Sequence, residues 1–98
     1  MRIVFTRRFE AELDRHLRDG AQRFGEKVAA ETFLKIDRAF RFVLAAQPHL
    51  GRYLPARDHY RYVVARTPFV IYYRISGEAL IAIAIRHGAQ NRSDLEPG

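Results

Sequence analysis

Residues 69–85 read FVIYYRISGEALIAIAI, and this stretch decides the fold. It contains two runs of β-branched, aromatic and aliphatic side chains, Phe69–Ile75 and Ala79–Ile85, which are the residue types that strands favour. The three residues between the runs, 76–78, include a glycine and suit a tight turn. The stretch therefore predicts two strands joined as an antiparallel hairpin.

The segments around this hairpin supply further strands. Tyr60–Arg66 is rich in tyrosine and valine and is separated from the hairpin by a turn at Thr67-Pro68, so it predicts a third strand. Arg2–Phe5 is a short run of the same type at the N-terminus. The segment 49–59 is polar and contains glycine and proline, which indicates a connector without regular structure.

Two helices are predicted between the first strand and the connector. Thr6 is a good N-cap residue, and a stripe at helical spacing follows it: Phe9, Leu13, Leu17, Gly20 and Phe24. Charged residues, among them Glu10, Glu12 and Asp14, are expected on the other sides of this helix. Gly25 is read as its end, with Gly20 as the alternative.

The second helix is predicted from Glu26 to Gln47, where Pro48 ends it. Its short break from the first helix requires an antiparallel helical hairpin. The order β-α-α-β-β-β predicts an α+β fold, with the helical hairpin packed on one face of an antiparallel sheet. We expect one domain over residues 1–98, with 93–98 as a flexible tail.

Composition limits the functions that this chain can have. Its 98 residues carry a net charge of +6 and include no cysteine, which excludes disulfides, thiolate nucleophiles and cysteine-ligated metals. No apolar run approaches the length of a membrane span, and Arg7 and Arg8 follow the first strand too closely for a signal peptide. We therefore expect a basic cytoplasmic protein with no membrane partner.

The positive charge is concentrated in the second half of the chain. Residues 48–92 contain seven arginines against two acids, Asp58 and Glu78, whereas both lysines, Lys27 and Lys35, lie earlier. Arginine is suited to gripping a carboxylate or a phosphate with its planar fork. An arginine-rich genome is an equally simple origin of this bias.

Strand alternation assigns side chains to the two faces of the sheet. Most large apolar residues fall on the face expected against the helices, including Ile81, Ile83 and Ile85 of the last strand, with Ala82 and Ala84 opposite. Arg61, Arg74 and Arg86, one from each predicted strand, fall together with Tyr72 on the other face, which we call the open face. It is either a solvated face or a basic platform for an acidic segment or a phosphate backbone.

Three motifs in this order and spacing resemble the RelE/ParE superfamily of bacterial type II toxin–antitoxin systems, and its ParE branch more than RelE. They are the segments 48–52 (Pro-His-Leu-Gly-Arg), 69–75 (Phe-Val-Ile-Tyr-Tyr-Arg-Ile) and 86–92 (Arg-His-Gly-Ala-Gln-Asn-Arg). The match extends from Phe5 to Arg92, which is nearly the whole chain.

The resemblance implies a toxin that blocks DNA gyrase without hydrolysing anything, held in a hetero-oligomer with a ParD-like antitoxin that has an acidic C-terminal segment. The alternative is a RelE-type endoribonuclease that cleaves mRNA on the ribosome, which needs a general base and a general acid on the sheet. The three strands contain no Lys, Asp or Glu, and this favours the ParE branch. A family member that binds its antitoxin and poisons nothing is a third possibility.

The residues expected to bind the antitoxin or the target are Arg61, Tyr72, Arg74, Arg86, His87 and Arg92. His87 lies at a strand end and is read either as a structural histidine or as an acid–base residue. The other histidines, at 16, 49 and 59, lack metal-ligand spacing, and no glycine-rich phosphate loop is present, so we predict no metal and no cofactor.

Overall fold

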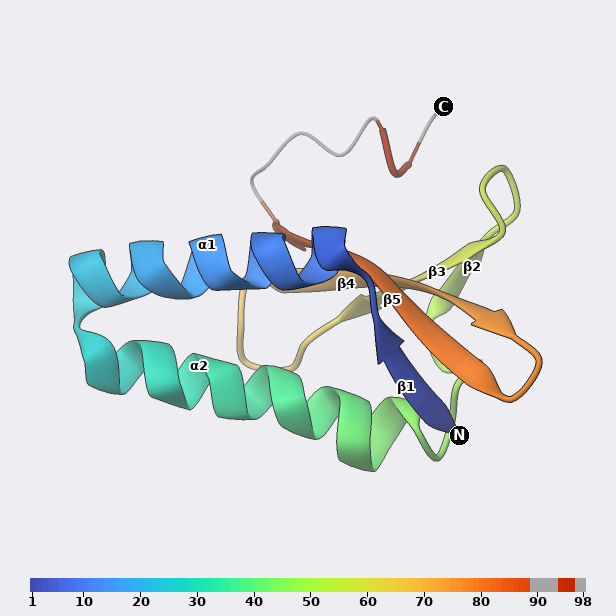
Figure 1. The fold of residues 1–98 in the computed structure, drawn as a ribbon, viewed down its shortest axis with the longest axis horizontal. Helices are drawn as coiled ribbons and strands as arrows, with labels where there is room; N and C mark the ends of the chain where they lie inside the picture. The colour runs from blue at the N-terminus through green and yellow to red at the C-terminus, as the bar shows by residue number, and fades with distance from the viewer. Residues whose placement is uncertain (89–93, 97–98) are drawn as a thin grey trace.

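The computed structural model describes residues 1–88 and 94–96, and places a helical hairpin over one face of a five-stranded sheet (Figure 1). The α+β architecture predicted from the sequence is thus confirmed. The elements are, in order, β1 (Arg2–Phe5), α1 (Arg7–Phe24), α2 (Glu26–Arg38), a π-helical continuation η1 (Ala39–Leu44), β2 (Arg52–Leu54), β3 (His59–Val63), β4 (Phe69–Ser76) and β5 (Ala79–His87).

The ends of α1 follow the sequence signals. The side chain of Thr6 accepts a 3.1 Å hydrogen bond from the backbone N–H of Phe9, as an N-cap residue does. The helix continues through Gly20 and ends at Gly25, whose φ of 93° lies in the region that glycine adopts most easily. The interpretation of Gly25 as the helix end is confirmed.

The sheet has the order β1-β5-β4-β3-β2, and it is mixed. The expectation of a purely antiparallel sheet is wrong for one pair, because β1 lies parallel to β5, with Arg2 opposite Ala79 and Phe5 opposite Ala82. A parallel pair requires a long crossover connection, and the helical hairpin and the remaining strands provide it. Strand β2 lies within the segment that we predicted as a connector, and it pairs antiparallel with β3.

The assignment of faces in β5 needs a correction at the middle of that strand. Tyr72 lies opposite Ala84 and Tyr73 opposite Ala82, so Ile83 is an extra residue without a partner in β4. Such a β-bulge reverses the alternation of side chains beyond it. Ala82 therefore faces the helices, whereas Ile83 belongs to the cluster on the opposite face and Ile81, opposite Arg74, lies on that face too, contrary to prediction. Ile85 and Ala84 have the predicted orientation.

Two apolar clusters hold the layers together. The larger one lies between the helices and the sheet and contains Phe9 and Phe40, whose rings lie tilted or edge-on to each other and to that of the more exposed Phe5, with centroids 5.1 to 5.5 Å apart. The smaller one lies on the open face and consists of Leu54, Val70, Tyr72, Ala84 and Leu95, with Ile83 packed against it. The open face thus has an apolar centre, which the placing of three arginines on this face by strand alternation did not predict.

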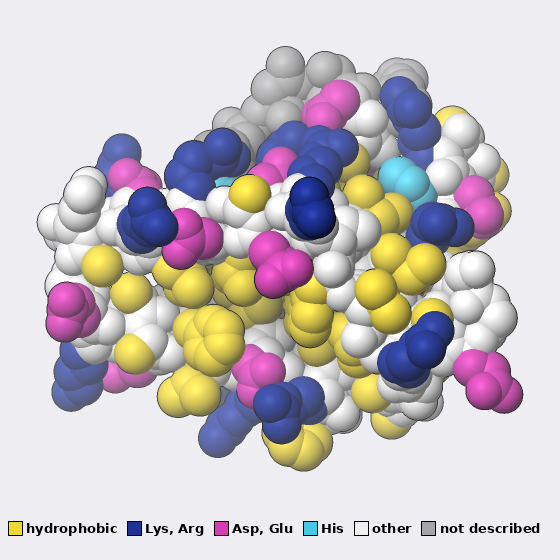
Figure 2. All heavy atoms as spheres, in the orientation of Figure 1, with side chains coloured by type: hydrophobic (Ala, Val, Ile, Leu, Met, Phe, Trp, Pro, Cys, Tyr) yellow, Lys and Arg dark blue, Asp and Glu magenta, His cyan; other side chains and the backbone are white. Residues whose placement is uncertain are grey.

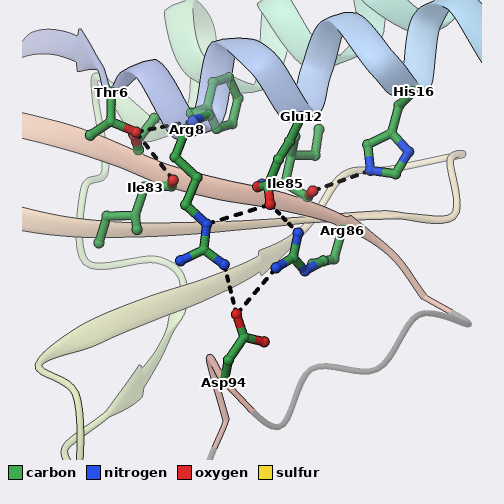
Figure 3. Close-up of polar contacts among 10 residues, drawn as sticks. Thr6, Arg8, Glu12, His16, Ile83, Ile85, Arg86 and Asp94 are labelled. Atoms are coloured by element: carbon green, nitrogen blue, oxygen red, sulfur yellow. Dashed lines mark hydrogen bonds and ion pairs between the residues drawn. The ribbon is translucent and has the colours of Figure 1, made fainter.

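Side chains of α1 cover the part of β5 that β1 is too short to reach. The Thr6 hydroxyl, just before the first residue of α1, donates a 3.0 Å hydrogen bond to the carbonyl oxygen of Ala82. Two residues further along α1 contact the backbone of Ile85. Glu12 accepts a 3.0 Å hydrogen bond from the backbone N–H of Ile85, and Nε2 of His16 lies 3.2 Å from its carbonyl oxygen (Figure 3). These polar contacts fix α1 along the strand and bring Glu12 to the edge of the open face.

Candidate partner-binding face

The strand register places the predicted arginines on one face of the sheet. Arg61 lies opposite Tyr72, and Val70 lies opposite Arg86, so these residues share the side of the sheet that carries the smaller apolar cluster. Arg74 follows Tyr72 by two residues in β4 and points to the same side. The open face predicted from strand alternation is therefore present.

Arg86 is the most enclosed of the three arginines, with a side chain that is 12% exposed. It forms an ion pair with Glu12, whose carboxylate also lies 3.4 Å from Nε of Arg8 (Figure 3). Glu12 is only 7% exposed, so two guanidinium groups neutralise a carboxylate that the fold has buried. Arg86 thus has a structural role in addition to the binding role that we expected.

The described part of the C-terminal segment, residues 94–96, lies against this face. Asp94 accepts hydrogen bonds from Arg8 at 2.7 Å and from Arg86 at 3.2 Å (Figure 3). The hydrogen bond from Arg8 lowers the pKa of the Asp94 carboxyl below its usual value. Leu95 is 1% exposed, and its burial holds this part of the chain on the sheet.

A second carboxylate is bound at the other side of Leu95. Glu96 lies 3.2 Å from Nε of Arg61 and also accepts a hydrogen bond from the hydroxyl of Tyr72. The side chains of Arg61 and Glu96 are each 21% exposed. The open face therefore binds two carboxylates of the chain itself, one on each side of a buried leucine.

Arg74 differs from the other two arginines. It is exposed at the far end of β4, and no ion pair is formed by it within residues 1–88 and 94–96. Its charge remains available to a partner that covers the open face.

His87 lies on the opposite side of the sheet, next to the helices. Its ring meets that of Phe69 edge-on, with centroids 5.7 Å apart, and the rings of Phe69 and His16 also meet edge-on, with centroids 5.0 Å apart. Together these residues line a pocket of about 290 Å³ between the sheet and the tip of the helical hairpin. Burial lowers the pKa of the His16 imidazole, which favours its neutral form. Arg92, the last of the predicted binding residues, lies outside the described residues.

A second apolar surface lies between the two helices. Figure 2 shows hydrophobic side chains gathered along the groove between α1 and α2. The apolar residues that line the groove near its centre are Phe5, Phe9, Leu13, Phe33, Ile36 and Phe40, and two acids, Glu10 and Asp37, line it with them. Phe5 and Phe33 are more than 40% exposed, so this groove could bury an amphipathic segment of another chain.

Sequence reasoning missed Glu12, Arg8 and the tail residues as parts of this face. Glu12 was assigned to the charged side of α1, although it lies three residues after Phe9 and next to Leu13, on the margin of the buried stripe. An acid in that position is a signal for a buried ion pair. Nothing in the local sequence of Asp94–Glu96 indicates a contact with strands that lie earlier in the chain.

Other kinds of site receive no support from the described residues. Among residues 1–88 and 94–96, no cluster of His, Asp and Glu side chains could hold a metal ion. Neither helix in this part of the chain has the length and apolar character needed to cross a membrane.

Comparisons with known proteins agree on one family. Residues 3–92 match the family described as the ParE toxin of the type II toxin–antitoxin system parDE. Toxin ParE3 of Caulobacter vibrioides is 31% identical over 90 residues, which cover 92% of this chain and 89% of that protein. The fold is similar to a chain of the chromosomal ParDE system of P. aeruginosa, with a TM-score of 0.76 at 20% identity, covering 89% of this chain and 95% of that one.

Proposed function

The chain belongs to the ParE toxin family of type II toxin–antitoxin systems, and from this premise we propose that it inhibits DNA gyrase and is neutralised by a tightly bound ParD-like antitoxin. The antitoxin is the partner of the open face and of the groove between α1 and α2. Gyrase is the target in the cytoplasm.

One observation carries the antitoxin part of the proposal. The open face already binds carboxylates, because Arg8 and Arg86 hold Asp94 while Arg61 and Tyr72 hold Glu96. A face that is built to receive two acids separated by an apolar residue suits an acidic segment of a partner protein. Arg74 adds an unpaired cation within the described part of the chain, and an antitoxin with acidic residues complements it.

The groove between the helices extends the same proposal. An amphipathic antitoxin helix laid along α1 and α2 would cover the exposed rings of Phe5 and Phe33. The acidic segment that follows this helix would then reach the open face. The antitoxin segment is expected to be disordered alone and to fold as it binds.

The chemistry of the open face favours gyrase over mRNA as the target. Endoribonuclease action requires groups that accept and donate a proton beside the scissile phosphate. Tyr72 is fully buried and bonded to Glu96, and Arg61 and Arg86 are held in ion pairs. His87 lies on the helix side of the sheet, away from these arginines. Within the described residues, this arrangement supports binding without hydrolysis.

We propose that the end of the chain from His87 to Arg92 contacts the target, together with Arg86 at its start. Deleting the whole segment from Arg86 onward would also remove the ion pair with Glu12 and would disturb the fold. Single substitutions, His87→Ala and Arg92→Ala, are therefore the cleaner variants.

The proposal is tested by adding the purified toxin to gyrase and relaxed plasmid. Supercoiling should be lost, cleaved DNA should accumulate, and equimolar antitoxin should restore supercoiling. The same toxin added to translating ribosomes should leave mRNA intact. Cleavage of mRNA at codons, abolished by His87→Ala, would instead establish the ribonuclease activity. Unimpaired growth after induction without antitoxin would show that the chain binds its antitoxin and poisons nothing.

A further inference from the structure

The three residues Asp94, Leu95 and Glu96 occupy the open face as a ligand would. Asp94 is held by Arg8 and Arg86 at one end, and Glu96 by Arg61 and Tyr72 at the other. Leu95 between them is 1% exposed. Every side chain of the segment thus has a matching group on the sheet or on α1.

The place that Leu95 fills is an apolar socket in a basic surface. Its members come from three strands: Leu54 from β2, Val70 and Tyr72 from β4, and Ala84 from β5, with Ile83 at the bulge packed against them. Arg8 and Arg86 lie beside one end of the socket and Arg61 beside the other. This layout selects an acid, an aliphatic residue and a second acid in consecutive positions.

The two acidic side chains of the segment are bound at ion pairs that are partly open to solvent. The Asp94 carboxylate is 53% exposed, and exposed ion pairs contribute little to stability. Leu95 is the one residue of the three that is fully buried. The segment is retained because it belongs to the same chain, which gives it a high effective concentration at the socket. A partner that offers the same pattern as part of a longer interface can displace it.

We infer that the open face is a socket for an acid–aliphatic–acid segment, that Asp94-Leu95-Glu96 fills it in the free toxin, and that the antitoxin displaces this tail by inserting a segment of the same pattern. The inference rests on the proposed antitoxin partner and adds the chemistry of the segment that the partner must supply. The tail of the toxin then competes with the antitoxin for the same socket.

A unique thiol reports the position of the tail, because the natural chain has no cysteine. In Leu95→Cys the thiol should react slowly with a maleimide reagent in the free toxin, since a cysteine in this place stays an apolar, buried side chain. Binding of a cysteine-free form of the co-expressed antitoxin should raise the reaction rate at least tenfold. Ala39→Cys, at a buried position of η1 in the larger apolar cluster, is the matched control and should stay protected in both states.

Two results overturn the inference. One is fast reaction of the Leu95→Cys thiol in the free toxin while the Ala39→Cys thiol is protected, which would mean that the tail is not seated. The other is continued protection of the Leu95→Cys thiol in the complex, which would mean that the antitoxin binds elsewhere. Failure of the antitoxin to bind at all contradicts the proposed function, and it is distinguishable because the free-toxin measurement still reports whether the tail occupies the socket.

A second measurement tests the pattern without the antitoxin. The full-length variant Leu95→Asp should release its tail, because a charge would enter the apolar socket. The vacated socket should then bind the synthetic peptide Ser-Asp-Leu-Glu-Pro-Gly, the sequence of residues 93–98. The peptide with Asp in place of Leu should bind this variant at least tenfold more weakly, for the same reason.

The same variant gives a kinetic test with the antitoxin. Leu95→Asp keeps every other residue of the toxin, so it should bind the antitoxin faster than the natural toxin does, since no seated tail has to leave first. Equal binding of the two peptides, or an unchanged association rate of Leu95→Asp, would overturn the inference.

Discussion

Gly51 lies directly against the hydroxyl of Tyr73, and the two residues are joined by a hydrogen bond. The backbone N–H of Gly51 donates to the tyrosine oxygen at 3.1 Å, and the hydroxyl in turn donates to the carbonyl oxygen of Pro48 at 2.7 Å. Tyr73 is fully buried, and burial raises the pKa of its hydroxyl, which stays protonated and able to donate. This bond connects two of the motifs on which the family resemblance rests, the segment 48–52 and strand β4.

Gly51→Ala should therefore destabilise the protein. A Cβ atom at this position would lie 2.7 Å from the Tyr73 hydroxyl and 2.9 Å from the carbonyl oxygen of Arg61, which is too close for either contact. We expect a loss of about 2 kcal/mol in the free energy of unfolding, as for other overpacked sites. Gly20→Ala is the control, because nothing lies within 4 Å of its Cβ position and alanine favours the helix by about 0.5–1 kcal/mol. Urea unfolding measures the free energy of unfolding of both variants. Equal changes in Gly51→Ala and Gly20→Ala would contradict the close contact at Gly51.

Glu12→Ala should be the more damaging of two acid substitutions in α1. It leaves Arg86 enclosed without its carboxylate and removes the acceptor for the Ile85 N–H. Breaking a buried pair in this way costs about 3 kcal/mol of stability. Asp14→Ala removes a carboxylate that is 58% exposed from an ion pair with Arg18, and the loss should be below about 0.5 kcal/mol. Similar losses for the two variants would show that Glu12 is not structurally important.

Stability should fall as the pH drops below neutrality, because two histidines resist protonation in the folded state. Burial lowers the pKa of both His16 and His59 below the usual 6.5, and Nδ1 of His59 is buried without a hydrogen-bond partner among the described residues. The unfolded chain then binds protons first, so the free energy of unfolding decreases as the pH falls through 6.5 toward the folded pKa values. Urea titrations over the range from about pH 7.5 to about pH 5 should show a smaller decrease for the double variant His16→Gln/His59→Gln. A decrease of the same size would assign the effect to other groups.

Arg74→Glu should weaken antitoxin binding without unfolding the toxin. Arg74 is exposed on the open face, so reversing its charge repels an acidic partner but breaks no ion pair seen in the described residues. We expect the dissociation constant to rise about tenfold, mainly through slower association at low salt. Arg38→Glu makes the same change of charge on α2, beside Tyr62 and Val64 and not among the residues that line the groove between α1 and α2, so it should have little effect. If Arg74→Glu and Arg38→Glu weaken antitoxin binding equally, the effect comes from the net charge of the toxin and not from the position of Arg74.

Local patterns in the sequence were sufficient to predict the helices, the strands other than β2, and the basic face. Thr6, Gly25 and the Ser76–Glu78 turn act on their immediate neighbours, so their effects can be read directly. The bulge at Ile83 could not be predicted, because strict alternation contains no information about which residue is left unpaired. For the same reason Ile81, Ala82 and Ile83 were assigned to the wrong faces.

The features of the candidate site that were missed depend on contacts between distant parts of the chain. Strand β1 pairs in parallel with β5 across more than seventy residues, and Glu12 reaches Arg86 over a similar separation. The seating of Leu95 depends on a socket made by three strands. Only the spacing of Glu12 from Phe9 offered a local sign of burial.

The hydrogen bonds from α1 to β5 also determine how this protein avoids unwanted association. An uncovered strand edge invites pairing with another chain, which leads to aggregation. Glu12 and His16 already occupy the N–H and the carbonyl oxygen of Ile85, the groups that an incoming strand would need. Along this half of β5, side chains of α1 take the hydrogen-bonding positions that the backbone of a neighbouring strand would otherwise fill. A partner that contributes a strand is thereby directed to the outer strands β1 and β2, at opposite ends of the sheet.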